Sequence, residues 1–124
     1  MEITERTIPT IDAKMVKELE AIYQEHLQFP GFPNGNCVRL SHEIAQKFGL
    51  TYSEGSFVLD FKPDNTLEID LPHAWCEDGN MTIVDLTASQ FNKGLKNKVP
   101  DGVMFLKPED ELYLRYKKID ETKK

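Results

Sequence analysis

Residues 67–86 read Leu67-Glu-Ile-Asp-Leu-Pro-His-Ala-Trp-Cys-Glu-Asp-Gly-Asn-Met-Thr-Ile-Val-Asp-Leu86. Two stretches with strand-like composition, 67–77 and 81–86, flank an Asp-Gly-Asn sequence at 78–80. Asp, Gly and Asn are residues that tight turns favour, because their backbones enter turn conformations readily. The stretch therefore predicts two antiparallel strands joined by a hairpin turn.

The register of this hairpin decides whether His73 meets Asp85. A loop of three residues, 78–80, pairs Glu77 with Met81 and sets His73 directly opposite Asp85. Opposed residues of an antiparallel pair point to one face of the sheet and lie about 5 Å apart. A loop of two or four residues would turn Asp85 to the other face. Three-residue loops are common in hairpins, so we expect a contact between His73 and Asp85.

Two helices are predicted ahead of the hairpin. Apolar residues recur at three- and four-residue spacing over 12–28, as on one face of an amphipathic helix. A second such pattern covers 37–48, and Gly49 is a typical helix stop. The segment between them, 29–36, holds two Pro, two Gly and two Asn and is expected to be a loop. A strand is expected within 52–61.

After the hairpin, a short helical turn is expected at 87–91 and further strands at 103–106 and 112–119. Residues 1–9 are expected to form an extended arm, and 120–124 a frayed tail. Helices followed by antiparallel strands are typical of the α+β class, here N-terminal helices packed on an antiparallel β-sheet. All 124 residues are expected to form a single domain, because no linker or repeat divides them.

Charge and hydropathy exclude several classes of function. The formal net charge is -6, and the basic residues are dispersed except for Lys93, Lys96 and Lys98 in a predicted loop, so no nucleic-acid partner is expected. Mean hydropathy is -0.48, and no apolar run approaches the roughly 20 residues of a membrane-spanning helix. The N-terminus does not resemble a secretory signal peptide. We therefore expect a cytoplasmic protein with no membrane partner, and delivery by a dedicated secretion system stays open.

Cys37 is the first candidate catalytic residue, because the N-terminus of a helix favours the reactive thiolate form of cysteine. The free backbone N–H groups there could also bind the oxyanion of a tetrahedral intermediate. The side chain of Asn36, or less favourably of Asn34, could add a further donor. The alternative for Cys37 is a small apolar residue at the start of a buried helix face.

His73 and Asp85 supply the other two groups of a Cys-His-Asp triad. Strand alternation puts His73 and Trp75 on one face, so Trp75 would flank the imidazole and contact substrate. His73 is expected to act as base and acid, and Asp85 to orient it. A carboxylate within an apolar run needs a partner, which His73 would provide. The alternatives are a His73 satisfied by the core or the surface, and an Asp85 that caps the next turn through Thr87.

Two other uses of the cysteines are disfavoured. Cys37, His73, Cys76 and Asp85 all carry metal-ligating groups, but His73 and Cys76 fall on opposite faces of one strand and cannot easily share an ion. The same alternation disfavours a disulfide between Cys37 and Cys76, and Cys76 is expected to be a packing residue. With two Cys and no export signal, both are expected to be reduced thiols. No metal or other cofactor is predicted.

Residues 73–91, which begin with His-Ala-Trp and end with Asp-Leu-Thr-Ala-Ser-Gln-Phe, resemble a known sequence pattern. They look like the corresponding segment of small bacterial and phage members of the papain-like and transglutaminase-like cysteine enzyme superfamily. The resemblance covers about residues 31–91. It implies a papain-like/transglutaminase-like core, in which a helix carrying the nucleophile Cys37 packs on an antiparallel sheet carrying His73 and Asp85.

The resemblance further implies a cysteine-dependent hydrolase or acyltransferase that acts on an amide, either a peptide bond or a glutamine side chain, through a thioester. Proteases, amidases, deamidases and transferases all use such a triad, so the expected partner is a protein, peptide or small amide substrate. The alternative is a catalytically inactive binding or accessory protein on the same fold. No papain-type Gln precedes Cys37, which leaves the oxyanion to Asn36, Asn34 or the backbone. Gln90 also fits the resemblance, and its expected role is packing.

Overall fold

The structure is a computed structural model, and it describes residues 9–32, 35, 37–62 and 69–119. The predicted N-terminal arm, except for Pro9, and the predicted C-terminal tail lie outside these residues. So do both asparagines that were predicted to bind the oxyanion, Asn34 and Asn36. The site is therefore built from the described residues alone.

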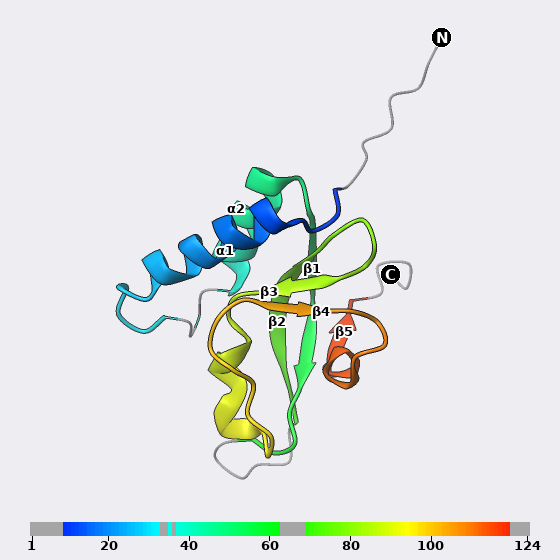
Figure 1. The fold of residues 1–124 in the computed structure, drawn as a ribbon. Helices are drawn as coiled ribbons and strands as arrows, with labels where there is room; N and C mark the ends of the chain where they lie inside the picture. The colour runs from blue at the N-terminus through cyan, green and yellow to red at the C-terminus, as the bar shows by residue number, and fades with distance from the viewer. Residues whose placement is uncertain (1–8, 33–34, 36, 63–68, 120–124) are drawn as a thin grey trace.

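The chain folds into two α-helices, two 3-10 helices and a five-stranded antiparallel sheet, counted over the described residues (Figure 1). The strand order is β4-β3-β2-β1-β5, and each neighbouring pair is antiparallel. This architecture belongs to the α+β class that the sequence predicts. In chain order the elements are α1 (Ala13–His26), α2 (Cys37–Phe48), β1 (Thr51–Val58), β2 (Asp70–Glu77), β3 (Ile83–Asp85), η1 (Ala88–Gly94), β4 (Met104–Leu106), η2 (Glu111–Arg115) and β5 (Tyr116–Lys118).

Local signals in the sequence set the bounds of both α-helices. The Asp12 side chain accepts a hydrogen bond from the Met15 backbone N–H at 2.8 Å and so caps α1, because the first N–H groups of a helix lack intrahelical partners. At the end of α2, Gly49 takes a φ of +74°, a left-handed conformation that glycine adopts without strain. The predicted extent of α2 is confirmed at both ends. No helix among the described residues has the length and apolar composition needed to cross a bilayer.

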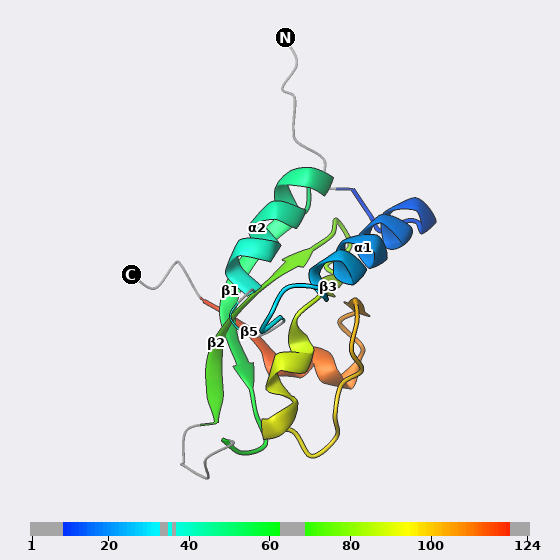
Figure 2. The same ribbon diagram turned by 90° about the vertical axis from the view of Figure 1, so that its left-hand side faces the viewer.

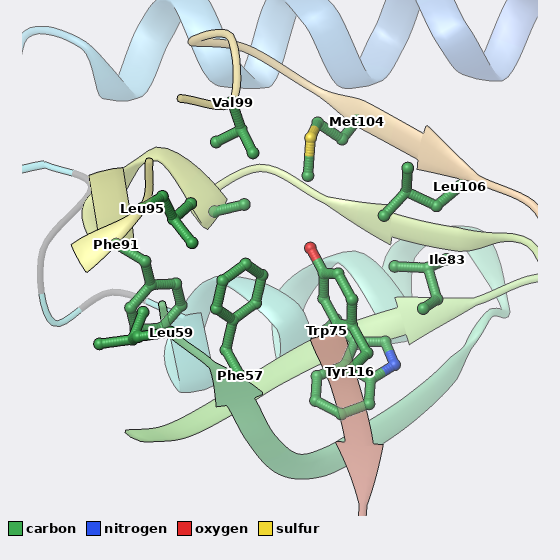
Figure 3. Close-up of a cluster of buried hydrophobic side chains, with 11 residues drawn as sticks. Phe57, Leu59, Trp75, Ile83, Phe91, Leu95, Val99, Met104, Leu106 and Tyr116 are labelled. Carbon is green, nitrogen blue, oxygen red and sulfur yellow. The ribbon is translucent and has the colours of Figure 1, made fainter. Parts of the chain in front are cut away.

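The two α-helices cover one face of the sheet, and 3-10 helices and loops cover the other (Figure 2). Cys76 and Val84 point to the helical face, where they pack with Leu19 of α1 and Leu40 of α2. Trp75 lies on the opposite face, in a second cluster shown in Figure 3. Both faces are therefore buried along 73–77 of β2 and along β3, which holds these parts of the two strands firmly at the centre of the molecule.

The second cluster shows that the sheet curls. It contains Met104 and Leu106 from β4, at one edge of the sheet, and Tyr116 from β5, at the other edge (Figure 3). Residues from opposite edges of a five-stranded sheet can meet only if the sheet bends around them, as strand twist allows. As a result Tyr116 reaches β3, although two strands separate β5 from β3.

The predicted register of the hairpin is wrong by one residue on each strand. Glu77 pairs with Ile83 instead of Met81, and the ladder extends one step further, because Asp78 donates its backbone N–H to the Thr82 carbonyl at 3.0 Å. The loop still has three residues, but they are 79–81. Because the loop begins and ends one residue later than predicted, each residue of β2 pairs with a residue two positions further along β3. A shift of two residues conserves the face to which each side chain points.

Asp78 explains why the loop closes later than predicted. Its carboxylate accepts hydrogen bonds from the backbone N–H groups of Asn80 at 2.8 Å and Thr82 at 2.9 Å, which draws the chain around it. The left-handed residue that a three-residue loop requires is then Met81, with a φ of 65°. The left-handed residue is thus neither the Gly nor the Asn of the Asp-Gly-Asn sequence.

The end of the chain departs from the predicted strand at 112–119. Residues 111–115 form η2, and only 116–118 form β5, which pairs with β1. The two strands approach closely at Gly55, where a Cβ atom would overlap the backbone of Lys117. Glycine at this point lets β5 dock on β1 and brings Tyr116 over the face that carries His73.

Candidate active site

His73 and Asp85 form a buried pair at the centre of the sheet. His73 Nε2 lies 2.6 Å from Asp85 Oδ2, and their side chains are 0% and 1% exposed. Continued along the strands, the observed register puts Asp85 opposite Trp75, so His73 reaches the carboxylate from a diagonal position. Diagonal neighbours in a sheet lie about 7–8 Å apart at the backbone, within reach of a long side chain. The expected contact thus exists without the expected pairing.

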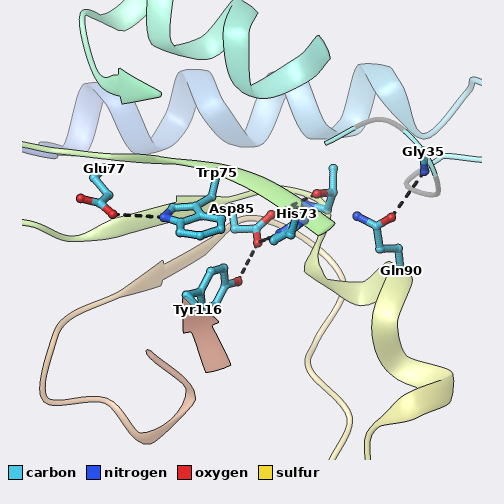
Figure 4. A network of polar contacts seen from close by, with 8 residues as sticks. Gly35, His73, Trp75, Glu77, Asp85, Gln90 and Tyr116 are labelled. Atoms are coloured by element: carbon cyan, nitrogen blue, oxygen red, sulfur yellow. Dashed lines mark hydrogen bonds and ion pairs between the residues drawn. The ribbon is translucent and has the colours of Figure 1, made fainter. Parts of the chain in front are cut away.

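The Asp85 carboxylate receives hydrogen bonds at both oxygens (Figure 4). Oδ2 accepts from the Tyr116 hydroxyl at 2.6 Å in addition to His73, and Oδ1 accepts from the backbone N–H and the hydroxyl of Thr87 at 2.8 and 3.1 Å. Burial alone would raise the pKa of Asp85, but the charge of His73 and these donors outweigh burial and lower it. The carboxylate is therefore the stable form.

The contact of Thr87 with Asp85 can be predicted from the sequence more easily than the contact of Tyr116 with Asp85. Thr87 contacts the carboxylate two residues before it, a local turn that an Asp-x-Thr sequence favours. Tyr116 comes from the far edge of the sheet, and its contact depends on the curl of the whole fold. Burial and the neighbouring charge of Asp85 raise the pKa of Tyr116 well above 10.0, so its hydroxyl remains a neutral donor.

Asp85 fixes the tautomer of His73. An ionised carboxylate can only accept, so Nε2 of the imidazole carries a proton and Nδ1 is the nitrogen that can take up another. Burial lowers the pKa of His73, but the charge and hydrogen bond of Asp85 raise it more, and the pKa is about 9. Phe91 packs edge-on against the imidazole, with ring centroids 4.8 Å apart, and helps to hold the ring in place.

Cys37, the first residue of α2, interacts with this imidazole. Burial would raise the pKa of the half-buried thiol, but hydrogen bonding to His73, the positive charge of His73 and a backbone hydrogen bond from Ala74 together lower it. Nδ1 of His73 has no hydrogen bond of good geometry to any described residue. Because Nε2 is engaged by Asp85, Nδ1 is the ring nitrogen left to interact with the thiol, and such contacts are often long in unliganded sites.

Cys76 is chemically unlike Cys37. It is buried on the helical face of β2, where its thiol donates to the Ser41 carbonyl at 3.1 Å. Burial, followed by the charge of Asp85, raises the pKa of Cys76 to about 12, so this thiol is inert near neutral pH. Both cysteines are free, and the described residues contain no cluster of three metal-ligating His, Cys, Asp or Glu side chains.

Trp75 does not occupy the position expected of a substrate-binding residue. Its side chain is 1% exposed, packs against Tyr116 with ring centroids 5.0 Å apart, and donates its indole N–H to Glu77 at 3.1 Å (Figure 4). We therefore assign Trp75 to the core that supports His73. The other histidines take no part in this pair: His26 bonds the Ile22 carbonyl within α1, and His42 stacks on a tyrosine.

A cavity of about 470 Å³ lies where α2, β1 and β5 meet, and neither Cys37 nor His73 lines it. Its lining includes His42 and Tyr52, whose rings stack with centroids 3.7 Å apart, together with Glu54 and Lys118. Burial and Glu54 raise the pKa of Tyr52, and the negative charges of Cys37 and Cys76 add to that rise. Cavities of this size accommodate small ligands or single side chains.

Together, these groups are arranged for nucleophilic chemistry at sulfur. The lowered pKa of Cys37 and the raised pKa of His73 favour a thiolate–imidazolium pair, and Asp85 stabilises the charged imidazole. The carboxylate in turn is held by Thr87 and Tyr116. Comparisons with protein-family models, with curated proteins and with solved structures found no match.

Proposed function

We propose that the protein is a cysteine-dependent hydrolase or acyltransferase that acts on an amide through a thioester. The observation that carries the proposal is the buried pair of His73 and Asp85, 2.6 Å apart, which leaves Nδ1 of His73 free to act on a half-buried thiol whose pKa the imidazole lowers. A purely structural histidine would not need a pKa of about 9 or an unpaired buried nitrogen beside a cysteine.

In the first half of the reaction, the Cys37 thiolate attacks the carbonyl carbon of the amide. A C–S bond forms and the carbonyl π electrons move to oxygen, giving a tetrahedral oxyanion. When the oxyanion collapses, the C–N bond breaks and the imidazolium of His73 gives its Nδ1 proton to the departing nitrogen. The products are an amine and a thioester on Cys37.

In the second half, neutral His73 takes a proton at Nδ1 from an incoming nucleophile, which attacks the thioester carbon and gives a second tetrahedral oxyanion. When this oxyanion collapses, the C–S bond breaks, the acyl group leaves on the nucleophile, and the thiolate of Cys37 and the imidazolium of His73 are restored. Water as nucleophile gives hydrolysis, and an amine gives acyl transfer. Throughout both halves, Asp85 keeps the imidazole in one tautomer and offsets its positive charge.

We also propose that the fold is a papain-like/transglutaminase-like core. Its support is the arrangement in which α2 begins with the nucleophile and packs on β2, and β2 and β3 carry the His and the Asp. A reactive thiolate must stay reduced, so the proposed working compartment is a reducing one such as the cytoplasm.

Alkylation with iodoacetamide tests the thiolate directly. An unperturbed thiol with a pKa of 9.0 is about 0.1% ionised at pH 6, so rapid alkylation there requires a lowered pKa. We expect fast labelling of Cys37 at about pH 6 and no labelling of Cys76 until the protein is unfolded. A Cys76→Ala variant should label like the wild type, and a Cys37→Ser variant should not label. Equally slow labelling of both cysteines would contradict the proposal and favour a non-enzymatic binding protein.

Activity is then sought in two assays on a mixed protein substrate. Release of ammonia would show action on glutamine side chains, whereas new N-termini would show cleavage of peptide bonds. The matched control is Cys37→Ser, which keeps the size of the side chain but provides a much weaker nucleophile. An activity that persists in Cys37→Ser would exclude Cys37 as its source.

A further inference from the structure

Gln90, on η1, contacts the loop that precedes the nucleophile. Its Oε1 accepts a hydrogen bond from the backbone N–H of Gly35 at 3.4 Å, and Gly35 lies two residues before Cys37 (Figure 4). This contact links the segment after Asp85 to the start of α2. The sequence pattern had favoured packing as the role of Gln90.

The contact also fixes the orientation of the carboxamide. The backbone N–H of Gly35 can only donate, so the oxygen of Gln90 must face it and the nitrogen must face away. That nitrogen, Nε2, is buried and has no hydrogen-bond partner among the described residues. A buried amide nitrogen without an acceptor costs about 1–3 kcal/mol, so its presence calls for an explanation.

A second unpaired atom lies at the same site. Among the described residues, the only buried side-chain nitrogen or oxygen atoms without a partner are Nε2 of Gln90 and Nδ1 of His73. The residue after Gln90, Phe91, packs on the His73 ring at 4.8 Å, and in Figure 4 the Gln90 nitrogen lies on the side of the carboxamide nearer His73. Hence one unpaired donor and the nitrogen assigned to proton transfer belong to one buried site.

We propose that Nε2 of Gln90 donates a hydrogen bond to the acyl oxygen of the substrate as that oxygen becomes the oxyanion. This inference rests on the proposed function and assigns Gln90, described in the structure, the side-chain role that the sequence pattern gave to Asn36 or Asn34. The thiolate of Cys37 forms the C–S bond, the displaced electron pair resides on oxygen, and the N–H of Gln90 stabilises that charge. A donor that lacks a partner until the oxyanion forms stabilises the transition state more than the ground state.

Two reagents separate this role from a role in supporting Cys37. Alkylation by iodoacetamide is a displacement at saturated carbon and forms no oxyanion. Acylation by p-nitrophenyl acetate passes through a tetrahedral oxyanion before p-nitrophenolate departs, and leaves an acetyl group on Cys37. The quantity measured is the ratio of the acylation rate to the alkylation rate, each taken on the plateau of that variant's own pH profile.

Two variants of Gln90 are compared with the wild type. Gln90→Glu keeps an oxygen for the Gly35 N–H but loses both N–H donors, and Gln90→Ala loses the whole carboxamide. Removing one oxyanion donor typically slows acyl transfer about 100-fold or more. We expect the ratio to fall at least about tenfold in both variants, with alkylation close to the wild-type rate.

A fall of this ratio by less than about tenfold in Gln90→Glu would overturn the proposal. The same holds if acylation and alkylation slow together, which would mean that the loop before Cys37 has moved. Gln90→Glu decides the outcome if Gln90→Ala does not fold. Failure of the proposed function itself has a different signature: the wild-type protein would show no selective alkylation of Cys37 over Cys76. Background acylation is measured on Cys37→Ser and subtracted.

Discussion

Replacing Asp85 by Asn should remove most of the reactivity that we propose for Cys37. The substitution keeps the size of the side chain and a carbonyl oxygen that can accept from His73 Nε2, but it removes the negative charge. Burial has the largest influence on the pKa of His73 and lowers it. The charge and the hydrogen bond of Asp85 come next, and both raise the pKa. Without them, burial dominates and the pKa should fall to its usual value of 6.5 or below.

The magnitude follows from the two values of the pKa. A fall from about 9 to 6.5 corresponds to about 3 kcal/mol of lost preference for the imidazolium form. Since the folded pKa of His73 lies above its unfolded value, the stabilisation is complete below about pH 6.5 and disappears as the pH rises through about 9. The free energy of unfolding should therefore drop over this range in the protein with Asp85 and change little in Asp85→Asn.

Two measurements check this reasoning in a Cys37→Ser background, which removes the titration of the thiol. The His73 ring proton signals give its pKa by NMR, and urea denaturation at several pH values gives the free energy of unfolding. Asp70→Asn, the same change at an exposed position of β2, serves as control. A His73 pKa that is as high in Asp85→Asn as in the Cys37→Ser protein that keeps Asp85 would refute the assignment of Asp85 as its cause. With Cys37 restored, alkylation at about pH 6 should also slow strongly.

Three further substitutions test parts of the fold that serve the site, each by urea denaturation. Tyr116→Phe removes a hydrogen bond to a charged Asp85 and should cost roughly 1.5–3 kcal/mol at neutral pH; because the Asp85 pKa is lowered by folding, the deficit should shrink as the pH falls below about 4, and a deficit independent of pH would indicate lost packing instead. Gly55→Ala forces a Cβ against the Lys117 backbone and should cost about 2–3 kcal/mol, whereas no loss would mean that β5 can move away freely. Met81→Gly relieves a left-handed backbone at an exposed side chain and should raise stability by roughly 0.5–1 kcal/mol; a decrease would show that Met81 packs usefully.

The sequence predicts the helices well because their ends depend on neighbouring residues. Asp12 caps α1 through the N–H of Met15, three positions away, and Gly49 ends α2 through its own backbone conformation. Such signals are complete within one turn of helix, so no knowledge of the rest of the fold is needed.

The hairpin is predicted in part, because its loop depends on a side chain as well as on composition. The Asp78 carboxylate binds two backbone N–H groups and also that of Ile11, which arrives from outside the hairpin. This arrangement moves the closure by one residue on each strand. The predicted contact between His73 and Asp85 exists although they are not paired, because the shift conserved the face to which their side chains point.

Tyr116 and Gln90 could not be placed from the sequence. Tyr116 meets Asp85 through the pairing of β5 with β1 and the curl of the sheet, and both are long-range properties. Gln90 meets Gly35 across 55 positions of chain. The positions of both donors therefore depend on the assembled fold: Tyr116, which donates to the Asp85 carboxylate, and Gln90, which we assign to the oxyanion.

The curl of the sheet has a consequence for when the reactivity that we propose for Cys37 would appear during synthesis. Cys37, His73 and Asp85 are all made before Tyr116, yet the carboxylate is enclosed only when β5 docks along β1. A nascent chain that lacks β5 would hold the three residues with Asp85 open to water, where the ion pair is weaker. The thiolate of Cys37 should thus reach its full reactivity only after β5 has left the ribosome. In an unfinished chain without β5, Cys37 should be less reactive.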